Sequence, residues 1–250
     1  MPDAPAYAIV GRGRWAQRMH VILQEHGRQT SSVGETRRES GEPEDHYRSR
    51  MTSALAATKA QIAWLCLPPG PHIPIITEAA ITAGLHVIAE KPWLVPPAET
   101  QRLINLAQSK QCLVGLHHEY CFLTEVAQWR QRFQGTKGLL FGGTFYLGRG
   151  DHTGIPAIEN LGSHLLAIRE FAVPQSELGL MFCAYERPDQ RRVWLEKDGA
   201  QVAALDLLAH REPIIQKFVD CFERAPETGS FPLDLRFAMR VAAALAAARQ

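Results

Sequence analysis

Two polar segments stand out because their side chains can move a proton beside a bound ligand. In the first, Glu90-Lys91-Pro92 directly follows the apolar run His86–Ala89, which is typical of a buried strand. Ligands of open α/β sheets bind beyond the carboxyl ends of the strands, where this charged pair would lie. A partly buried lysine in such a position donates a proton or provides a point charge, so we expect Lys91 to contact a ligand.

The second segment places an amide and an imidazole at helical spacing. A helix is predicted over residues 157–171, and Asn160 and His164 fall one turn apart on one face of it. An asparagine can orient an imidazole through a hydrogen bond, but it can neither take up a proton nor balance the charge of an imidazolium. The alternative is that His164 is a core histidine whose polar atoms are satisfied there.

A glycine-rich turn lies between an apolar strand, Ala6–Val10, and a helix that ends near His26. This order is typical of a site for dinucleotide phosphates. Gly11 permits the tight turn, Gly13 lets the backbone approach a pyrophosphate, and the small Ala16 allows the helix and strand to pack closely. Free N–H groups at the start of the helix would hold the phosphates. A plain strand-to-helix turn is the alternative.

Three motifs follow one another along the first half of the chain: Gly-x-Gly-x-x-Ala at 11–16, Pro-x-x-x-His at 68–72, and Ala-Gly-x-His-Val-x-x-Glu-Lys-Pro at 83–92. In this order they resemble the motifs of the glucose-fructose oxidoreductase / inositol dehydrogenase (Gfo/Idh/MocA) family. The resemblance is close over the first half of the chain and loose over the second half.

The resemblance implies hydride transfer at a nicotinamide, with Lys91 protonating the oxygen or nitrogen of the substrate. It places His164 beside the site of hydride transfer, and Asn160 stands where the family has an aspartate. It also implies a cis peptide bond before Pro92. The cofactor contacts that it implies are Gly11, Gly13 and Arg14 at the pyrophosphate, Pro68 and His72 on the nicotinamide side, and Trp15, Leu67, Glu90 and Lys91 nearby.

The end of the second predicted strand, residues 29–34, bears on the choice of cofactor. Glu35 could accept a hydrogen bond from the ribose 2′-hydroxyl of NAD and repel a 2′-phosphate. Thr36, Arg37 and Arg38 offer a hydroxyl and two guanidinium groups, which suit the 2′-phosphate of NADP. The alternative is that both arginines are solvated loop charges and Glu35 pairs with one of them. We favour NADP over NAD.

Adjacent histidines follow the last predicted strand of the first domain, residues 112–116. Neighbouring side chains on a strand point to opposite faces, so His117 and His118 cannot easily share an ion. No third ligand stands close in sequence, and we expect no metal. The junction borders the substrate pocket in the resembling family, which makes His118 and Tyr120 candidate substrate contacts. Packing between domains is the alternative role.

The order of predicted elements gives an α/β chain with two domains. Residues 1–120 form a Rossmann domain with a doubly wound parallel sheet, and residues 121–250 form a smaller α+β domain with a mainly antiparallel sheet. Short links favour antiparallel pairing among the strands predicted at 178–185, 191–196 and 201–208. The second domain is short for the family and leaves apolar sheet surface uncovered, so we expect a homodimer or a higher homo-oligomer.

Composition excludes several partners. The chain of 250 residues has a formal net charge of +1, which argues against nucleic acid or an anionic membrane as the main partner. Its apolar runs are shorter than a membrane span, and the first residues lack the features of a signal peptide. The five scattered cysteines are expected to be buried free thiols. We therefore expect a cytoplasmic protein.

These observations predict a cytoplasmic NAD(P)-dependent oxidoreductase. Its substrate would be a small polar carbonyl, alcohol or imine compound, and the resemblance implies a sugar or cyclitol as the common class. The alternative is a regulatory protein of the same fold that binds the dinucleotide without catalysis. The neutral Asn160 and the short second domain favour that alternative, whereas Glu90-Lys91-Pro92 and His164 argue against it.

Overall fold

The computed structural model describes residues 4–150 and 154–248, which form two compact units. The first unit comprises the residues up to His117 together with Cys221–Met239, and the second comprises His118–Asp220 and the residues from Arg240 onward. The sequence prediction placed everything after residue 120 in the second domain. The structure differs because Cys221–Met239 packs with the first unit.

The sheet of the first unit consists of five parallel strands in the order β2-β1-β3-β4-β5. The strands are β1 (Tyr7–Val10), β2 (Thr30–Val33), β3 (Ile62–Leu65), β4 (His86–Glu90) and β5 (Val114–His117). All five strands are only four or five residues long. Strands β1, β3 and β5 are buried along their whole length, which explains their nearly continuous apolar sequences. The predicted doubly wound parallel sheet is confirmed.

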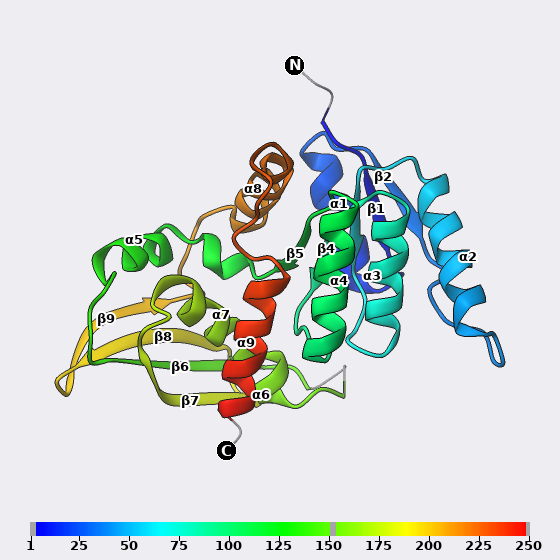
Figure 1. Ribbon diagram of the computed structural model, residues 1–250. Coiled ribbons are helices and arrows are strands. Elements are labelled where there is room, and N and C mark those ends of the chain that lie inside the picture. The colour runs from blue at the N-terminus through cyan, green and yellow to red at the C-terminus, as the bar shows by residue number, and fades with distance from the viewer. Residues whose placement is uncertain (1–3, 151–153, 249–250) are drawn as a thin grey trace. The chain divides into compact units, whose positions relative to one another are not determined.

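Helices connect successive strands and cover the sheet. They are α1 (Arg14–Glu25), α2 (Glu44–Ala57), α3 (His72–Thr82) and α4 (Pro97–Ser109), and the last three lie side by side in Figure 1. One core cluster joins these three helices to alternate strand residues such as Val10, Leu65 and Ala89. The apolar stripes of the helices therefore bury one face of the sheet and hold its carboxyl edge in place.

The other face of the sheet receives residues from the C-terminal part of the chain. Helix α8 (Ile214–Thr228) brings Glu223, which accepts a hydrogen bond from the Tyr7 hydroxyl at 2.8 Å and pairs with Arg28 at 2.8 Å. At β5, the Leu116 N–H donates to the Leu233 carbonyl at 2.8 Å. These contacts explain why Cys221–Met239 belongs to the first unit.

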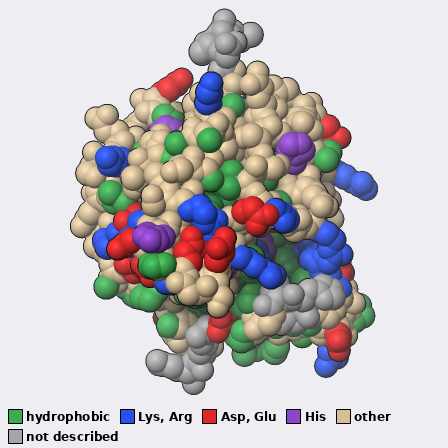
Figure 2. Space-filling model, turned by 90° about the vertical axis from the view of Figure 1, so that its right-hand side faces the viewer, with side chains coloured by type: hydrophobic (Ala, Val, Ile, Leu, Met, Phe, Trp, Pro, Cys, Tyr) green, Lys and Arg blue, Asp and Glu red, His purple; other side chains and the backbone are tan. Residues whose placement is uncertain are grey.

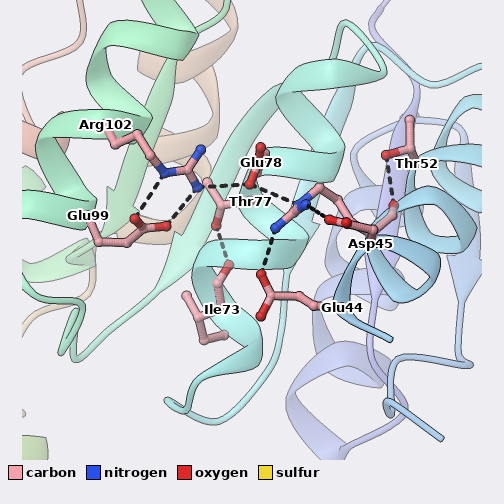
Figure 3. Close-up of polar contacts among 9 residues, drawn as sticks. Glu44, Asp45, Thr52, Ile73, Thr77, Glu78, Glu99 and Arg102 are labelled. Atoms are coloured by element: carbon pink, nitrogen blue, oxygen red, sulfur yellow. Dashed lines mark hydrogen bonds and ion pairs between the residues drawn. The ribbon is translucent and has the colours of Figure 1, made fainter. Parts of the chain in front are cut away.

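The outer sides of α2, α3 and α4 are joined by ion pairs (Figure 3). Glu78 of α3 pairs with Arg48 of α2 at 3.1 Å and with Arg102 of α4 at 2.8 Å. Within their own helices, Arg48 also pairs with Glu44 and Arg102 with Glu99. The face shown in Figure 2 likewise carries acidic and basic side chains close together and not a patch of one sign.

The second unit has a four-stranded mixed sheet in the order β7-β6-β8-β9. Its strands are β6 (Leu139–Leu147), β7 (Glu177–Tyr185), β8 (Gln190–Lys197) and β9 (Ala200–Asp206), and its helices include η1 (Glu119–Phe122), α5 (Thr124–Arg132), α6 (Ala157–Asn160) and α7 (Gly162–Ala172). The pair β8–β9 is antiparallel, as predicted from its short link, and β6–β8 is antiparallel as well. The antiparallel pairing predicted between β7 and β8 is wrong, because β7 pairs in parallel with β6. The short link between β7 and β8 therefore does not join neighbouring strands, because β6 lies between them.

One predicted helix has different limits in the structure. The helix predicted over 157–171 is divided at Leu161 into α6 and α7. Helix α8 carries Pro226 in its last turn, where the proline lacks the N–H that would donate to the Phe222 carbonyl. The final helix, α9, spans Leu235–Ala247. Across residues 4–150 and 154–248, none of the helices has both the length and the apolar character needed to cross a membrane.

Candidate functional site

The glycine turn after β1 has the geometry that a phosphate site requires. Gly11 has φ +123°, and a Cβ there would lie 2.7 Å from the Cys66 carbonyl oxygen, so both the conformation and the space select glycine. Gly13 is the N-cap of α1, and a Cβ on it would meet nothing within 4 Å. The helix start is therefore open and has no capping side chain on Gly13. A dinucleotide phosphate fits this space, with N–H groups of α1 as donors.

The next residues along the turn, Arg14 and Trp15, are the first two residues of α1. Arg14 is exposed, whereas Trp15 is half-buried and turns its indole toward the sheet. Leu67 follows β3 and lies beside the glycine turn, since its Cδ2 is 3.3 Å from the position of a Cβ on Gly11. The structure thus brings Gly11, Gly13, Arg14, Trp15 and Leu67 together at one edge of the sheet.

Pro68 and His72 lie just beyond β3. His72 is the first residue of α3, and its ring lies across Gly70, where a Cβ would be 2.8 Å from the His72 Cε1. Burial lowers the pKa of His72, while a hydrogen bond with the Pro68 carbonyl opposes part of this effect. The imidazole is therefore neutral at pH 7 and is held against the loop that leads into α3.

Glu90, at the end of β4, is the centre of a buried hydrogen-bond cluster. Its Oε1 atom accepts bonds from Trp15 Nε1 at 2.5 Å, Trp64 Nε1 at 2.9 Å and His117 Nδ1 at 3.1 Å. The side chain is 10 % exposed. Burial alone would raise the pKa of Glu90, but the charge of His117 and the three hydrogen bonds outweigh it, so the pKa lies below its ordinary value. Glu90 is thus a carboxylate that ties α1 to three strands.

Ring contacts support the same arrangement. Trp15 stacks on His117 with centroids 5.7 Å apart, and Trp64 meets His117 edge-on at 5.1 Å. His117 was considered in the sequence only as a metal ligand, and its role here is to donate to Glu90. The register of the sheet explains the hydrogen bond between Glu90 and His117, because these residues are direct neighbours on the parallel strands β4 and β5.

Lys91 follows Glu90 at the carboxyl edge of the sheet and is half-buried. The bond between Lys91 and Pro92 is cis, as the sequence resemblance implied. The segment that follows is fixed by the Trp93 indole, which donates to Thr100 Oγ1 at 2.9 Å. Lys91 therefore extends from a well-anchored turn, on the same sheet edge as the glycine turn.

The segment after β2 is organised by basic side chains. Arg12 of the glycine turn forms an ion pair with Glu35, and both side chains are mostly exposed. Arg50 of α2 donates to the carbonyls of Glu35 at 3.1 Å and Arg37 at 2.9 Å. The side chain of Arg37 is exposed. The charge of Glu35 is thus offset by Arg12, a residue that sequence reasoning did not single out.

Thr36 and Arg38 have their own fixed contacts in this segment. The Tyr47 hydroxyl donates to the Thr36 carbonyl at 2.6 Å, and Arg38 Nε donates to the Glu42 carbonyl at 2.7 Å. Glu42 also pairs with Arg50 at 2.9 Å, and this hydrogen bond lowers the pKa of Glu42 to about 2. The backbone that would face an adenosine ribose is therefore held by several independent bonds.

The second unit gathers aromatic and titratable side chains around His164, the third residue of α7. The His164 ring is stacked on Phe145 at 5.1 Å, and it meets Tyr120 edge-on at 5.3 Å and His118 edge-on at 6.1 Å. His118, Tyr120 and His164 are each less than 10 % exposed. The structure thus brings together three residues that the sequence selected separately.

Two charged residues that the sequence did not indicate belong to this cluster. Arg191 of β8 donates to the Tyr120 hydroxyl at 2.7 Å and lies over the Phe145 ring. Glu119 of η1 places its Oε2 atom 4.0 Å from His164 Nδ1. Burial raises the pKa of Tyr120, although Arg191 opposes this effect, so the phenol is protonated at neutral pH. Arg191 is remote in sequence, but Glu119 directly follows His118 and could have been noticed.

Asn160 ends α6, and the break at Leu161 separates it from α7. Its Nδ2 atom donates to the Tyr185 hydroxyl at 2.9 Å, and that hydroxyl donates to the Ile155 carbonyl at 3.0 Å. The predicted single helix for Asn160 and His164 is therefore replaced by two short helices. Among residues 4–150 and 154–248, no group of three or more His, Cys, Asp or Glu is arranged to hold a metal ion.

Comparison with known proteins agrees with this geometry. Residues 6–118 match a family described as "Oxidoreductase family, NAD-binding Rossmann fold". An uncharacterized oxidoreductase of Schizosaccharomyces pombe is 28 % identical over 74 residues, which are 30 % of this chain and 20 % of that protein. The chain thus matches only about a fifth of the length of this curated relative.

Solved structures extend the comparison to the whole chain at the level of the fold. The UDP-N-acetylglucosamine 3-dehydrogenase GnnA from Acidithiobacillus ferrooxidans superposes with a TM-score of 0.77 at 16 % identity, covering 96 % of this chain and 95 % of GnnA. KijD10, a 3-ketoreductase from Actinomadura kijaniata solved with TDP-benzene and NADP, gives a TM-score of 0.70 at 14 % identity. The match covers 98 % of this chain and 96 % of KijD10. Residues 6–118 therefore match the Gfo/Idh/MocA oxidoreductase family, and the whole chain shares the fold of these solved structures.

Proposed function

We propose that this protein is an NAD(P)-dependent oxidoreductase acting on a small polar carbonyl, alcohol or imine compound. The observation that carries the proposal is one sheet edge that holds both an open helix start at Gly13 and an anchored lysine, Lys91. The first fits a dinucleotide phosphate, and the second supplies a proton. When bound, the nicotinamide would donate or accept the hydride.

The residues of the chain would divide the remaining work. Gly11, Gly13 and Arg14 bind the pyrophosphate, and the carboxylate of Glu90 keeps Trp15 and the turn before Lys91 in place. Lys91 gives a proton to the substrate oxygen or nitrogen in reduction and receives it in oxidation. His164 provides the second polar contact to the substrate. The neutral amide of Asn160 can neither take up a proton nor balance charge on His164.

NADP is the cofactor that we favour. The pairing of Glu35 with Arg12 removes much of the repulsion that a free carboxylate would exert on a 2′-phosphate. Arg37 is exposed beside it and carries the charge that such a phosphate needs. The matched family is described as NAD-binding, and KijD10 was solved with NADP, so relatives support either dinucleotide.

We also propose that the protein assembles as a homodimer or higher homo-oligomer. Leu140 of β6 and Leu180 and Phe182 of β7 are large apolar side chains with 39 %, 69 % and 47 % of their surface exposed. Successive side chains along β7 point to opposite faces of the sheet, so Leu180 and Phe182 lie on the same face. This face is turned away from the buried core of the second unit. Exposed apolar surface of this kind is a common basis for association.

Turnover and cofactor binding, measured separately, test the function. With candidate ketones, sugars and imines, absorbance at 340 nm and transfer of deuterium from labelled NADPH should show hydride transfer. Lys91→Ala should lower turnover by about a hundredfold to ten-thousandfold without weakening cofactor binding. Lys91→Arg should rescue little, because a guanidinium does not release its proton at neutral pH.

Lys110→Ala is the matched control, since Lys110 is an exposed lysine of the same unit, at the end of α4. It should leave turnover unchanged. Normal turnover in Lys91→Ala would remove the catalytic assignment of Lys91. Tight cofactor binding without hydride transfer to any carbonyl or imine would favour a non-catalytic regulator.

A further inference from the structure

The imidazole of His164 is held in a fixed orientation by its neighbours. Phe145 stacks on one side with an interplanar angle of 11°, and Tyr120 and His118 approach edge-on at 74° and 86°. The His164 side chain is only 7 % exposed. A ring confined in this way cannot turn its nitrogen atoms toward a new partner without displacing these groups. The direction of each nitrogen is therefore set by the fold.

One carboxylate lies near a nitrogen of this ring. Oε2 of Glu119 is 4.0 Å from Nδ1 of His164, and the Glu119 side chain is 16 % exposed. This separation exceeds a hydrogen bond but suits an ion pair, and partial burial limits the screening of its charge by solvent. Asn160, four residues before His164 in the sequence, has a neutral amide that donates a hydrogen bond to the Tyr185 hydroxyl. The carboxylate that pairs with His164 therefore comes from η1.

We propose that Glu119 is a positioning residue that acts through His164, as the anion that stabilises the charged form of its imidazole. The proposal rests on the proposed function for its catalytic meaning, but the pairing itself is a property of the second unit alone. A carboxylate on the Nδ1 side favours a proton on Nδ1 and leaves Nε2 as the proton acceptor. With this anion in place, His164 can take a proton from an alcohol substrate, which Asn160 alone could not support.

Other titratable groups surround the pair and must be considered. His118 and Tyr120 touch the His164 ring, Arg191 donates to the Tyr120 hydroxyl, and His210 meets the Tyr120 ring edge-on. The positive charge of Arg191 opposes an imidazolium, but it is partly offset by Asp189 at 3.6 Å. Of these groups, Glu119 is the one that forms an ion pair with an imidazole nitrogen of His164. The net effect of its removal should therefore be a loss of the charged form of His164.

Titration of the His164 ring by NMR in the full chain tests the pairing without substrate. The signal is assigned by its loss in His164→Asn, and the variants compared are Glu119→Gln, which keeps the shape, and Glu119→Asp, which keeps the charge. In Glu119→Gln the midpoint of the His164 titration should move to lower pH by about one pH unit or more. Glu119→Asp should keep it closer to wild type, and Glu177→Gln, an exposed acid at the start of β7, should not change it.

The pairing is overturned if Glu119→Gln leaves the midpoint unchanged, or if Glu119→Asp moves it as far as Glu119→Gln does. A second measurement concerns turnover. In the oxidation direction the acidic limb of the pH–rate profile should move with the titration midpoint, and kcat in Glu119→Gln should change while cofactor affinity stays the same. If the midpoint moves as expected but the wild type transfers no hydride, the proposed function fails and the pairing stands.

Discussion

Replacing Glu90 with glutamine should separate the effect of its charge from that of its shape. The variant Glu90→Gln keeps an oxygen that can accept hydrogen bonds but removes the negative charge that Trp15, Trp64 and His117 now share. Hydrogen bonds to charged groups contribute about 1.5–3 kcal/mol each, against about 0.5–1.5 for neutral pairs. Weakening three bonds by about 1 kcal/mol each gives a loss of about 3 kcal/mol.

A buried carboxylate also costs more to desolvate than an amide, so part of this loss is recovered. We expect a net destabilisation of about 1–2 kcal/mol at pH 7. The pH dependence has a definite sign. Because the pKa of Glu90 is lower in the folded protein than in the unfolded chain, its contribution is present above the unfolded pKa and is lost as pH falls through the folded value. The difference between wild type and Glu90→Gln should therefore shrink in acid.

Urea unfolding of both proteins at several pH values, followed by tryptophan fluorescence, measures this difference. The indole N–H signals of Trp15 and Trp64 should also shift upfield in the variant, because their bonds to the acceptor weaken. Glu44→Gln is a suitable control, since Glu44 is 51 % exposed in its pair with Arg48 and should contribute no more than about 0.5 kcal/mol. A loss of stability in Glu90→Gln that is the same at pH 7 and in acid would refute the reasoning.

Three further predictions concern the cofactor, the core and the assembly. The protein should bind NADPH more tightly than NADH, and Arg37→Ala should weaken NADPH selectively; equal or tighter binding of NADH in fluorescence titrations would assign the ribose to Glu35 instead. Gly115→Ala should destabilise the protein by about 1–3 kcal/mol in urea unfolding, because the added Cβ would lie 2.7 Å from the Phe231 ring and 2.8 Å from the Phe222 ring. Gly84→Ala is the comparison, since a Cβ there would meet no neighbouring atom and only its positive backbone φ would be strained. Light scattering should give a homo-oligomer, and Phe182→Glu should dissociate it; a wild-type mass near 27.8 kDa would contradict this.

The first unit could be predicted from the sequence in most respects. Strands β1, β3 and β4 are short, nearly continuous apolar runs closely followed by glycine, proline or charged residues, and such runs are typical of a buried parallel sheet. The glycine turn and Glu90-Lys91-Pro92 follow two of these strands directly, so their place at one edge follows from the parallel order. Local sequence was sufficient here because each motif is adjacent to the strand that positions it.

The second unit could be predicted less well, because its arrangement depends on contacts between distant residues. The insertion of β6 between β7 and β8 brings together strands far apart in sequence, and no short link reveals it. The break at Leu161 leaves the helical spacing of Asn160 and His164 intact in sequence, although the helix is divided. Glu119 and Arg191 are ordinary charged residues until the fold places them beside His164 and Tyr120.

The packing of Phe222 and Phe231 onto Gly115 has a consequence for the order of events during synthesis. The two rings meet edge-on at 5.0 Å and fill the space over a glycine of β5, yet more than a hundred residues separate them from it in sequence. A ribosome therefore releases all of β1–β5 long before the residues that cover this face exist. The nascent sheet must keep an apolar surface exposed while His118–Asp220 of the second unit are made, and a chaperone that binds apolar segments would find its target at β5 during that interval.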